Sequence, residues 1–297
     1  MSILPRVLLT GATGFLGSHL LEALLNKGYE VVILKRSSSD IYRIQRFLNK
    51  VVSYNVDLQP LEMAFEEQRI NVVIHTAGRY GRDGCGIAEI VESNVLFGTR
   101  ILDASIKYNT DTFFNTDTFF NTDAFLQPYL NDYALSKRHF LDWLKQHSKN
   151  IQVMNLKLEH VFGVKDDDNK FVMWFLSQLK NNSPDIRLTL GEQKRDFIYI
   201  DDVVSAFLLV IDRCKTLPKF YEFEVGTGQL TTVREFAERM AKNFQKNNIN
   251  KTKLLFGAIP YRKGEVMSVN VNIENLENIG WRSRVTLNEG IKRVIAG

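Results

Sequence analysis

Tyr133 and Lys137 are the two side chains whose types and spacing suggest the most specific chemistry in this sequence. On a helix, a spacing of four residues places both side chains on one face, one turn apart. A lysine ammonium beside a phenol favours the phenolate and lowers the pKa of the tyrosine. Such a tyrosine can exchange a proton with a carbonyl oxygen while hydride moves at the carbon. The pair predicts acid–base catalysis, with chance spacing as the alternative.

A glycine-rich turn near the start of the chain is a candidate phosphate-binding loop. Glycine lets the backbone approach a ligand closely and adopt positive φ, and a helix that begins there directs N–H groups towards an anion. The spacing is GxxGxxG, whereas the general dinucleotide fingerprint is GxGxxG. We therefore predict a pyrophosphate site, with an ordinary glycine turn as the alternative. Its predicted cofactor contacts are Gly11, Thr13, Gly14, Phe15, Leu16 and Gly17.

The next apolar run ends in the basic and hydroxyl-bearing residues Lys35, Arg36 and Ser37. In an NAD-binding fold, an acidic residue at this place would bond the ribose 2′-hydroxyl. Basic side chains suit a 2′-phosphate instead, so the stretch favours NADPH. A solvated basic turn is the alternative.

Two further strand ends supply candidate cofactor contacts. Asp57 closes the expected third strand, with Leu58 beside it, and is a candidate for the adenine edge. The segment after the fourth strand would pass beneath the nicotinamide half. Its candidate contacts are Thr76, Ala77 and Gly78.

The elements that position these residues alternate between strands and helices. The apolar runs and helical periodicities predict an α/β fold with a Rossmann-type, doubly wound parallel sheet. The expected strands are residues 6–10, 30–34, 51–56, 71–75, 113–115 and 152–156, and the expected helices are 16–25, 61–68, 87–108 and 133–147.

The alternation breaks after about residue 163, which predicts a smaller mixed α/β region for substrate binding. Residues 164–170 read as a polar loop, with helices expected at 171–179 and 233–243 and short strands at 187–190 and 222–225. We predict a dinucleotide-binding domain over 1–160, to which 197–215 returns. The predicted substrate-binding region is 161–196 with 216–297.

Composition narrows the class of protein. The 297 residues are 44% hydrophobic and 24% charged, which excludes a disordered chain, and a net charge of +4 with no basic stripe argues against nucleic acid. With two cysteines, no CxxC and no metal-ligand spacing among the histidines, we predict no metal site. The Asp166–Asp168 run reads as a solvated loop. Without a signal-peptide pattern or an apolar run of membrane-spanning length, we expect a cytoplasmic protein that does not bind membranes.

These motifs together resemble the extended short-chain dehydrogenase/reductase family, also called the NAD-dependent epimerase/dehydratase family, along nearly the whole chain. The resemblance implies epimerase, dehydratase or reductase chemistry on nucleotide-diphosphate sugars, with Asn94 among the cofactor contacts. The matching segments are Thr10–Gly17, Asp57, His75–Gly78, Asn94–Thr99, Tyr133–Lys137, Leu158–Gly163, Arg195–Asp202, Glu224–Gly228 and Gly280–Trp281.

Within the family, three segments look most like the CDP-abequose and CDP-paratose synthases: Phe114–Thr118, Leu156–His160 and Gly191–Phe197. Those enzymes reduce a 4-keto sugar with NADPH to make 3,6-dideoxyhexoses for O-antigen. Family dehydratases carry Thr-Asp-Glu where this chain has Thr116, Asp117 and Thr118, so dehydratase chemistry is disfavoured. An NAD-dependent epimerase is the runner-up. A non-catalytic NADP(H)-sensing protein is the alternative of another class, although such proteins typically lose the Tyr/Lys pair.

The resemblance also implies the catalytic roles. Tyr133 would protonate the C4 oxygen, Lys137 would bond the nicotinamide ribose, and Thr116 would hydrogen-bond the C4 oxygen. A repeat of Asp-Thr-Phe-Phe-Asn-Thr at 111–122 leaves Thr118 and Thr122 as rivals of Thr116.

The same resemblance implies substrate contacts and an oligomeric state. Arg195 and Arg262 would hold the diphosphate, since a guanidinium fork suits phosphate; a surface ion pair is the alternative for each. We also expect a homodimer formed through the helices that hold 94–107 and 133–147. The other candidate substrate contacts are Arg79, Tyr80, Glu159, His160 and Phe171.

Overall fold

The computed structural model describes residues 5–80, 84–109, 112–118, 131–246 and 248–297, and for 112–118 it describes the backbone alone. The chain divides into two compact units. Of the described residues, the first unit comprises 5–80, 84–109, 112–118, 131–157 and 204–223, and the second comprises 158–203, 224–246 and 248–297.

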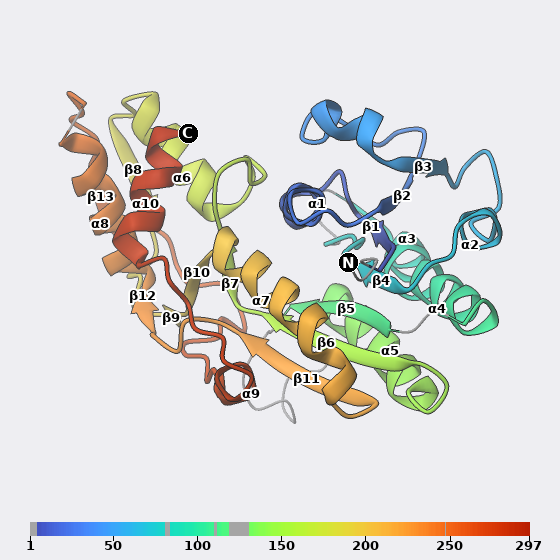
Figure 1. Ribbon diagram of the computed structural model, residues 1–297. Coiled ribbons are helices and arrows are strands. Elements are labelled where there is room, and N and C mark those ends of the chain that lie inside the picture. The colour runs from blue at the N-terminus through green and yellow to red at the C-terminus, as the bar shows by residue number, and fades with distance from the viewer. Residues whose placement is uncertain (1–4, 81–83, 110–111, 119–130, 247) are drawn as a thin grey trace. The chain divides into compact units, whose positions relative to one another are not determined.

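A seven-stranded sheet with the order β11-β6-β5-β4-β1-β2-β3 forms the centre of the first unit (Figure 1). The pairs β1–β2, β2–β3, β1–β4 and β4–β5 are parallel. The order 3-2-1-4-5-6 is that of a doubly wound dinucleotide-binding sheet, which confirms the predicted α/β, Rossmann-type class. The strands are β1 (Val7–Thr10), β2 (Val31–Lys35), β3 (Val52–Asn55), β4 (Val72–His75), β5 (Thr112–Thr118), β6 (Gln152–Leu158) and β11 (Phe220–Val225).

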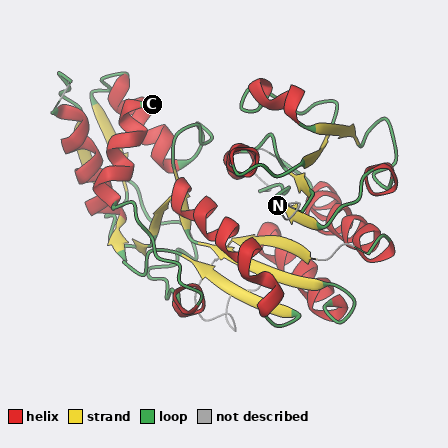
Figure 2. Cartoon of the chain, in the orientation of Figure 1, coloured by secondary structure: helices red, strands yellow, loops and turns green. Residues whose placement is uncertain are grey.

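Helices alternate with these strands along the chain (Figure 2). The helix predicted over 87–108 is interrupted, because a π-helical turn, η2, separates α3 from α4. Periodicity alone carries no signal for such a turn. The helical elements are α1 (Phe15–Asn26), η1 (Gln45–Lys50), α2 (Met63–Glu67), α3 (Ile87–Val91), η2 (Glu92–Leu96), α4 (Phe97–Lys107), α5 (Asp132–His147), α7 (Ile200–Arg213) and η3 (Cys214–Thr216).

The ends of two helices follow from local sequence. α1 ends at Asn26, two residues before Gly28, whose φ of 87° suits glycine. α5 begins after Asn131, whose side chain accepts a hydrogen bond from the backbone N–H of Ala134 at 2.8 Å. This cap fixes Tyr133 in the first turn of α5.

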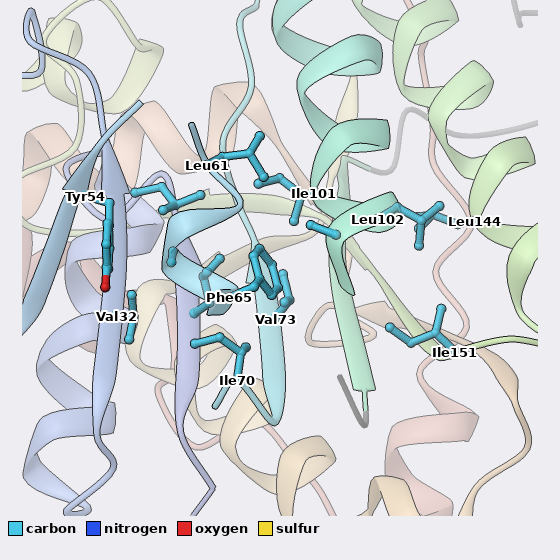
Figure 3. Packing of buried hydrophobic residues seen from close by; sticks show 14 of the residues in the cluster. Val32, Tyr54, Leu61, Phe65, Ile70, Val73, Ile101, Leu102, Leu144 and Ile151 are labelled. Carbon is cyan, nitrogen blue, oxygen red and sulfur yellow. The ribbon is translucent and has the colours of Figure 1, made fainter. Parts of the chain in front are cut away.

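A hydrophobic cluster packs the first unit's strands against α2, α4 and α5 (Figure 3). Val73 of β4 and Ile101 of α4 are fully buried in it, as is Phe140 of α5. Burial of each such side chain contributes about 1.5–3 kcal/mol. A Cβ on Gly98 would lie 2.7 Å from the Phe140 ring, so α4 and α5 need glycine there to approach closely. The cluster therefore sets the position of the helix that carries Tyr133 and Lys137.

The second unit contains three two-stranded sheets, β10–β7, β12–β9 and β13–β8. Both helices predicted from periodicity are present, and the strand expected at 187–190 lies at 185–188. The elements are β7 (His160–Phe162), α6 (Phe171–Lys180), β8 (Asp185–Leu188), β9 (Lys194–Arg195), β10 (Phe197–Tyr199), β12 (Thr231–Thr232), α8 (Val233–Gln245), β13 (Lys253–Phe256), α9 (Glu274–Asn278) and α10 (Leu287–Ala296). Across the described ranges, every helix is too short or too polar to traverse a bilayer.

Candidate active site

The glycine turn after β1 lies directly against the segment after β4. A Cβ on Gly11 would stand 2.6 Å from Thr76 Oγ1 and 2.7 Å from the backbone nitrogen of Ala77. The Thr76 hydroxyl donates to the carbonyl of Thr10 at 2.8 Å, and the Ala77 N–H donates to the Thr10 hydroxyl at 3.3 Å. The structure therefore brings together two of the predicted cofactor-contact segments.

The first turn of α1 packs on the same glycine turn. Gly14 donates its N–H to the Gly11 carbonyl at 2.9 Å, and a Cβ on Gly17 would overlap that carbonyl. Gly14 caps α1 without a side chain, and the first turn holds no acidic residue. A helix N-terminus of this kind suits a phosphate group, and the close backbone packing fits a dinucleotide pyrophosphate.

Gly17→Ala is expected to weaken binding of a nicotinamide dinucleotide at least about tenfold and to lower stability by about 1–3 kcal/mol. The new methyl group would meet backbone, which cannot move away without distorting the turn. Isothermal titration calorimetry and thermal unfolding measure both effects. Gly86→Ala is the control, because a Cβ there meets nothing within 4 Å; equal effects of the two changes would contradict the prediction.

The basic turn after β2 is held to the end of β3. The backbone N–H of Ser37 donates to Asp57 Oδ2 at 2.7 Å, and Asn55 donates to the Ser37 hydroxyl at 3.0 Å. No salt bridge to a described residue engages Lys35 or Arg36. Leu58, a predicted cofactor contact, is 79% exposed.

Tyr133 and Lys137 are both buried, at 7% and 6% exposure, on α5. The ring of Tyr133 lies 4.9 Å, centroid to centroid, from Tyr80, which follows β4. The Lys137 ammonium contributes to lowering the pKa of His75, the last residue of β4. Tyr133 and Lys137, the predicted catalytic pair, therefore lie near the carboxyl end of β4.

His75, the last residue of β4, was predicted only as part of the segment that would pass beneath the nicotinamide half, with no role of its own. Its Nδ1 lies 2.9 Å from the Thr10 hydroxyl, which joins the ends of β4 and β1. Burial, and then the Lys137 ammonium, lower the pKa of His75 to about 3, so the ring is neutral at physiological pH. The motif that ends β4 signalled the segment but not this cross-strand bond.

Asn94 lies in the π-helical turn η2 and is buried. Its Oδ1 accepts from the backbone N–H of Arg79 at 2.7 Å, while Nδ2 donates to the Arg79 carbonyl and the Ser136 hydroxyl, each at 2.9 Å. Asn94 was predicted as a cofactor contact. In the structure its side chain links the segment after β4 to α5 by hydrogen bonds. Ser136, which lies between Tyr133 and Lys137 in the sequence, was not predicted as a site residue.

The predicted threonine lies at the end of β5. Asn115 is paired in register with His75, so the backbone of Thr116 follows that pair directly. The side chains of Thr116 and Thr118, and all of Thr122, lie outside the described residues.

In the second unit, Arg195 is buried and paired. Its Nη2 donates to Glu265 Oε1 at 2.6 Å and Nη1 donates to the Lys194 carbonyl at 2.8 Å. A surface ion pair was the alternative left open for this residue, and the structure shows an ion pair in which Arg195 is buried and Glu265 is partly buried. Arg262, by contrast, is exposed.

The other predicted substrate contacts of this unit lie among aromatic and charged side chains. Phe171 packs against Phe175 and Phe236. Burial and the charge of Arg195 lower the pKa of His160 to about 3. Glu159 is buried, and neither of its carboxyl oxygens has a hydrogen-bond partner among the described residues.

The Asp166–Asp168 run was predicted to be a solvated loop, but its first residue is buried. Asp166 is buried and forms an ion pair with Lys170 at 2.9 Å. Within the described ranges, no cluster of three His, Cys, Asp or Glu residues could hold a metal ion.

Residues 7–226 match the NAD dependent epimerase/dehydratase family, and the chain belongs to this family. The chain is 33% identical to the CDP-abequose synthase of Salmonella muenchen, over 100% of this chain and 99% of that protein. The UDP-glucose 4-epimerase of Thermotoga maritima, solved with UDP-glucose, shares the fold at a TM-score of 0.83 and 24% identity, over 98% of this chain and 97% of that one. The Thermus thermophilus UDP-glucose 4-epimerase, solved with NAD, has a TM-score of 0.81 and 25% sequence identity to this chain, over 98% of both chains.

Proposed function

We propose that this chain is an NADPH-dependent 4-ketoreductase of nucleotide-diphosphate 4-keto-deoxyhexoses. The proposed reaction converts CDP-4-keto-3,6-dideoxyglucose into CDP-abequose or CDP-paratose, for O-antigen or another surface polysaccharide. The observation that carries the proposal is the full-length match to a CDP-abequose synthase at 33% identity. The buried Tyr133 and Lys137, one helical turn apart and facing the end of β4, supply the acid–base chemistry that this reaction needs.

The proposed mechanism assigns one proton transfer to this chain. Bound NADPH supplies the hydride that reduces C4. Tyr133 gives its phenolic proton to the C4 oxygen, and the adjacent ammonium of Lys137 favours the phenolate that results. Thr116 is proposed to hydrogen-bond the same oxygen. Asn94, through Ser136 and the backbone of Arg79, holds the helix and loop in place.

An NAD-dependent nucleotide-sugar epimerase is the second candidate, because the fold is shared with UDP-glucose 4-epimerases. The distinguishing feature is the turn after β2, where Lys35 and Arg36 stand in place of an acidic residue. A homodimer formed through α4 and α5 is part of the proposal for either activity.

The test follows NADPH oxidation with purified protein and CDP-4-keto-3,6-dideoxyglucose. Control reactions replace the CDP sugar with dTDP- or GDP-linked 4-keto-6-deoxy sugars, and NADPH with NADH. Consumption of NADPH with the CDP sugar is expected, and the C4 configuration of the product distinguishes abequose from paratose. No oxidation with any keto sugar, together with NAD(H) released on denaturation, would overturn the reductase in favour of an epimerase.

The double change Lys35→Glu with Arg36→Ala is expected to reduce the preference for NADPH over NADH about 100-fold. A carboxylate repels the 2′-phosphate and can accept a hydrogen bond from a 2′-hydroxyl. Ratios of kcat/KM for the two cofactors measure the effect. Lys50→Glu, which alters a basic residue in η1, is the control, and an unchanged ratio in the double variant would show that the basic turn does not select the cofactor.

A further inference from the structure

The segment between β2 and η1 folds back onto the glycine turn that follows β1. Arg43 of this segment is partly buried, and its Nη1 donates to the backbone carbonyl of Thr13 at 3.4 Å. Thr13 directly precedes Gly14, the residue that caps α1. A guanidinium that is 30 residues away in the sequence is therefore placed at the glycine turn by the fold.

Two buried side chains fix the backbone from which Arg43 projects. Ile44, which precedes η1, is fully buried, and Phe47 within η1 is 8% exposed. The backbone N–H of Ile44 donates to the Ile41 carbonyl at 2.9 Å, and that of Phe47 donates to the Ile44 carbonyl at 2.8 Å. The contact of Arg43 with the glycine turn thus starts from a backbone that buried side chains hold in place.

The basic turn after β2 begins at the same corner of the sheet. β1 and β2 are parallel, and Thr10 is paired in register with Leu34. The glycine turn after Thr10 therefore starts directly beside Lys35, the last residue of β2, and Arg36 follows. The cationic side chains of Lys35, Arg36 and Arg43 thus belong to one stretch of chain that begins and returns beside the glycine turn.

The nearby acidic residues of this stretch and of β3 accept hydrogen bonds from its backbone. Asp57 Oδ2 accepts from the N–H of Ser37 at 2.7 Å, and Asp40 Oδ1 accepts from the N–H of Tyr42 at 3.0 Å. These two carboxyl groups shape the turn on either side of its tip. The three cationic side chains suit an anionic ligand at this corner.

The anion that fits Arg43 is a phosphate on the adenosine side of a dinucleotide. A guanidinium carries five N–H donors in one plane, so one that bonds a backbone carbonyl can also donate to a phosphate. The pyrophosphate of a dinucleotide lies at the helix N-terminus after the first strand, and its adenosine ribose lies at the end of the second strand. Arg43 approaches from the segment after β2, so the phosphate on its side is the 2′-phosphate of that ribose.

We infer that Arg43 is a specificity-determining residue that binds the 2′-phosphate of NADPH together with Lys35 and Arg36. The inference rests on the proposed function for the identity of the cofactor. It deepens that function, because the preference for NADPH then depends on a side chain outside the basic turn that also contacts the glycine turn.

Arg46, three residues further along, supplies a matched control. Its guanidinium carbon lies 4.6 Å from the centroid of the Phe47 ring, and that of Arg43 lies 4.7 Å from the centroid of the Tyr42 ring. Arg46 differs in its polar contact, because it forms an ion pair with Glu22 of α1 at 2.7 Å. Arg43→Gln and Arg46→Gln therefore remove the same charge from similar surroundings, and only the first removes it from the glycine turn.

Calorimetry compares adenosine 2′,5′-bisphosphate with 5′-AMP, and then NADPH with NADH. Arg43→Gln is expected to weaken binding of the two 2′-phosphate ligands about tenfold and to leave the other two within about twofold of wild type. Arg43→Lys is expected to keep all four within about threefold, because an ammonium also binds phosphate. Arg46→Gln is expected to leave all four within about twofold.

Four results would overturn the inference. Unchanged binding in Arg43→Gln would show that the guanidinium does not meet the ligand. An equal loss for ligands with and without the 2′-phosphate would show that Arg43 only supports the turn or binds the pyrophosphate. A loss in Arg43→Lys as large as in Arg43→Gln would show that the charge is not what is recognised. The same selective loss in Arg46→Gln would reduce the effect to the net charge of this surface.

The same measurements separate the inference from the proposed function. If the wild-type protein binds NADPH no better than NADH, the proposed cofactor preference and the role of Arg43 are both overturned. If the double variant of Lys35 and Arg36 loses a preference that Arg43→Gln retains, only the inference is overturned. Reduction of the 4-keto sugar is tested by its own assay, whose result does not depend on these binding ratios.

Discussion

Replacing Tyr133 with phenylalanine is expected to lower kcat for the proposed reduction of a 4-keto sugar about 10³-fold and to leave the affinity for the proposed cofactor, NADPH, within about threefold. Phenylalanine keeps the ring that packs against Tyr80 but removes the only phenolic proton on this face of α5. General acid catalysis by one positioned group contributes about 10²–10⁴-fold to a rate. Single-turnover oxidation of NADPH measures the chemical step directly.

The control for this prediction is Tyr42→Phe, which removes the hydroxyl of an exposed tyrosine in the same unit. It is expected to leave kcat unchanged. A Tyr133→Phe protein with full turnover would show that another group supplies the proton. A joint fall in turnover and cofactor affinity would indicate that the hydroxyl positions the cofactor instead.

The contact between the glycine turn after β1 and the segment after β4 follows closely from sequence, because strand order and glycine turns are local properties. Alternating apolar runs and helical periods predict the parallel sheet, and the parallel arrangement brings the ends of β1 and β4 together. The contact between Gly11 and Thr76 is a consequence of that order. Prediction of the loop therefore needed no knowledge of side-chain packing.

The second unit was predicted less well, since its strands are two to four residues long and pair in three separate sheets. Runs of that length carry little periodic signal. The partners of Arg195 and Asp196 lie 70 and 31 residues further along the chain. Such long-range pairs depend on packing, so sequence spacing could not reveal that Arg195 is paired with Glu265, or that the Glu159 carboxyl has no hydrogen-bond partner among the residues that the structure describes.

Replacing Asp196 with alanine is expected to lower the free energy of unfolding of the second unit by about 3–5 kcal/mol, the largest stability effect that we predict. Its carboxyl group accepts from the N–H and hydroxyl of Thr227 and from the N–H of Gly228 at 2.7–2.9 Å. Each buried donor left without an acceptor costs about 1–3 kcal/mol. A Cβ on Gly226 would stand 2.6 Å from Asp196 Oδ2, so the turn is built around this carboxyl group.

Urea unfolding followed by the fluorescence of Trp174 and Trp281, both in the second unit, measures this loss in a Trp143→Phe background. Asp201→Ala is the control, because its exposed ion pair with Arg293 at 2.8 Å contributes no more than about 1 kcal/mol. Equal losses in the two variants would contradict the prediction. A loss confined to Asp196→Ala would show that the turn after β11 depends on this one carboxyl group. Because Asp196 directly follows β9, whose last residue is Arg195, the same carboxyl group would then also support the position of Arg195.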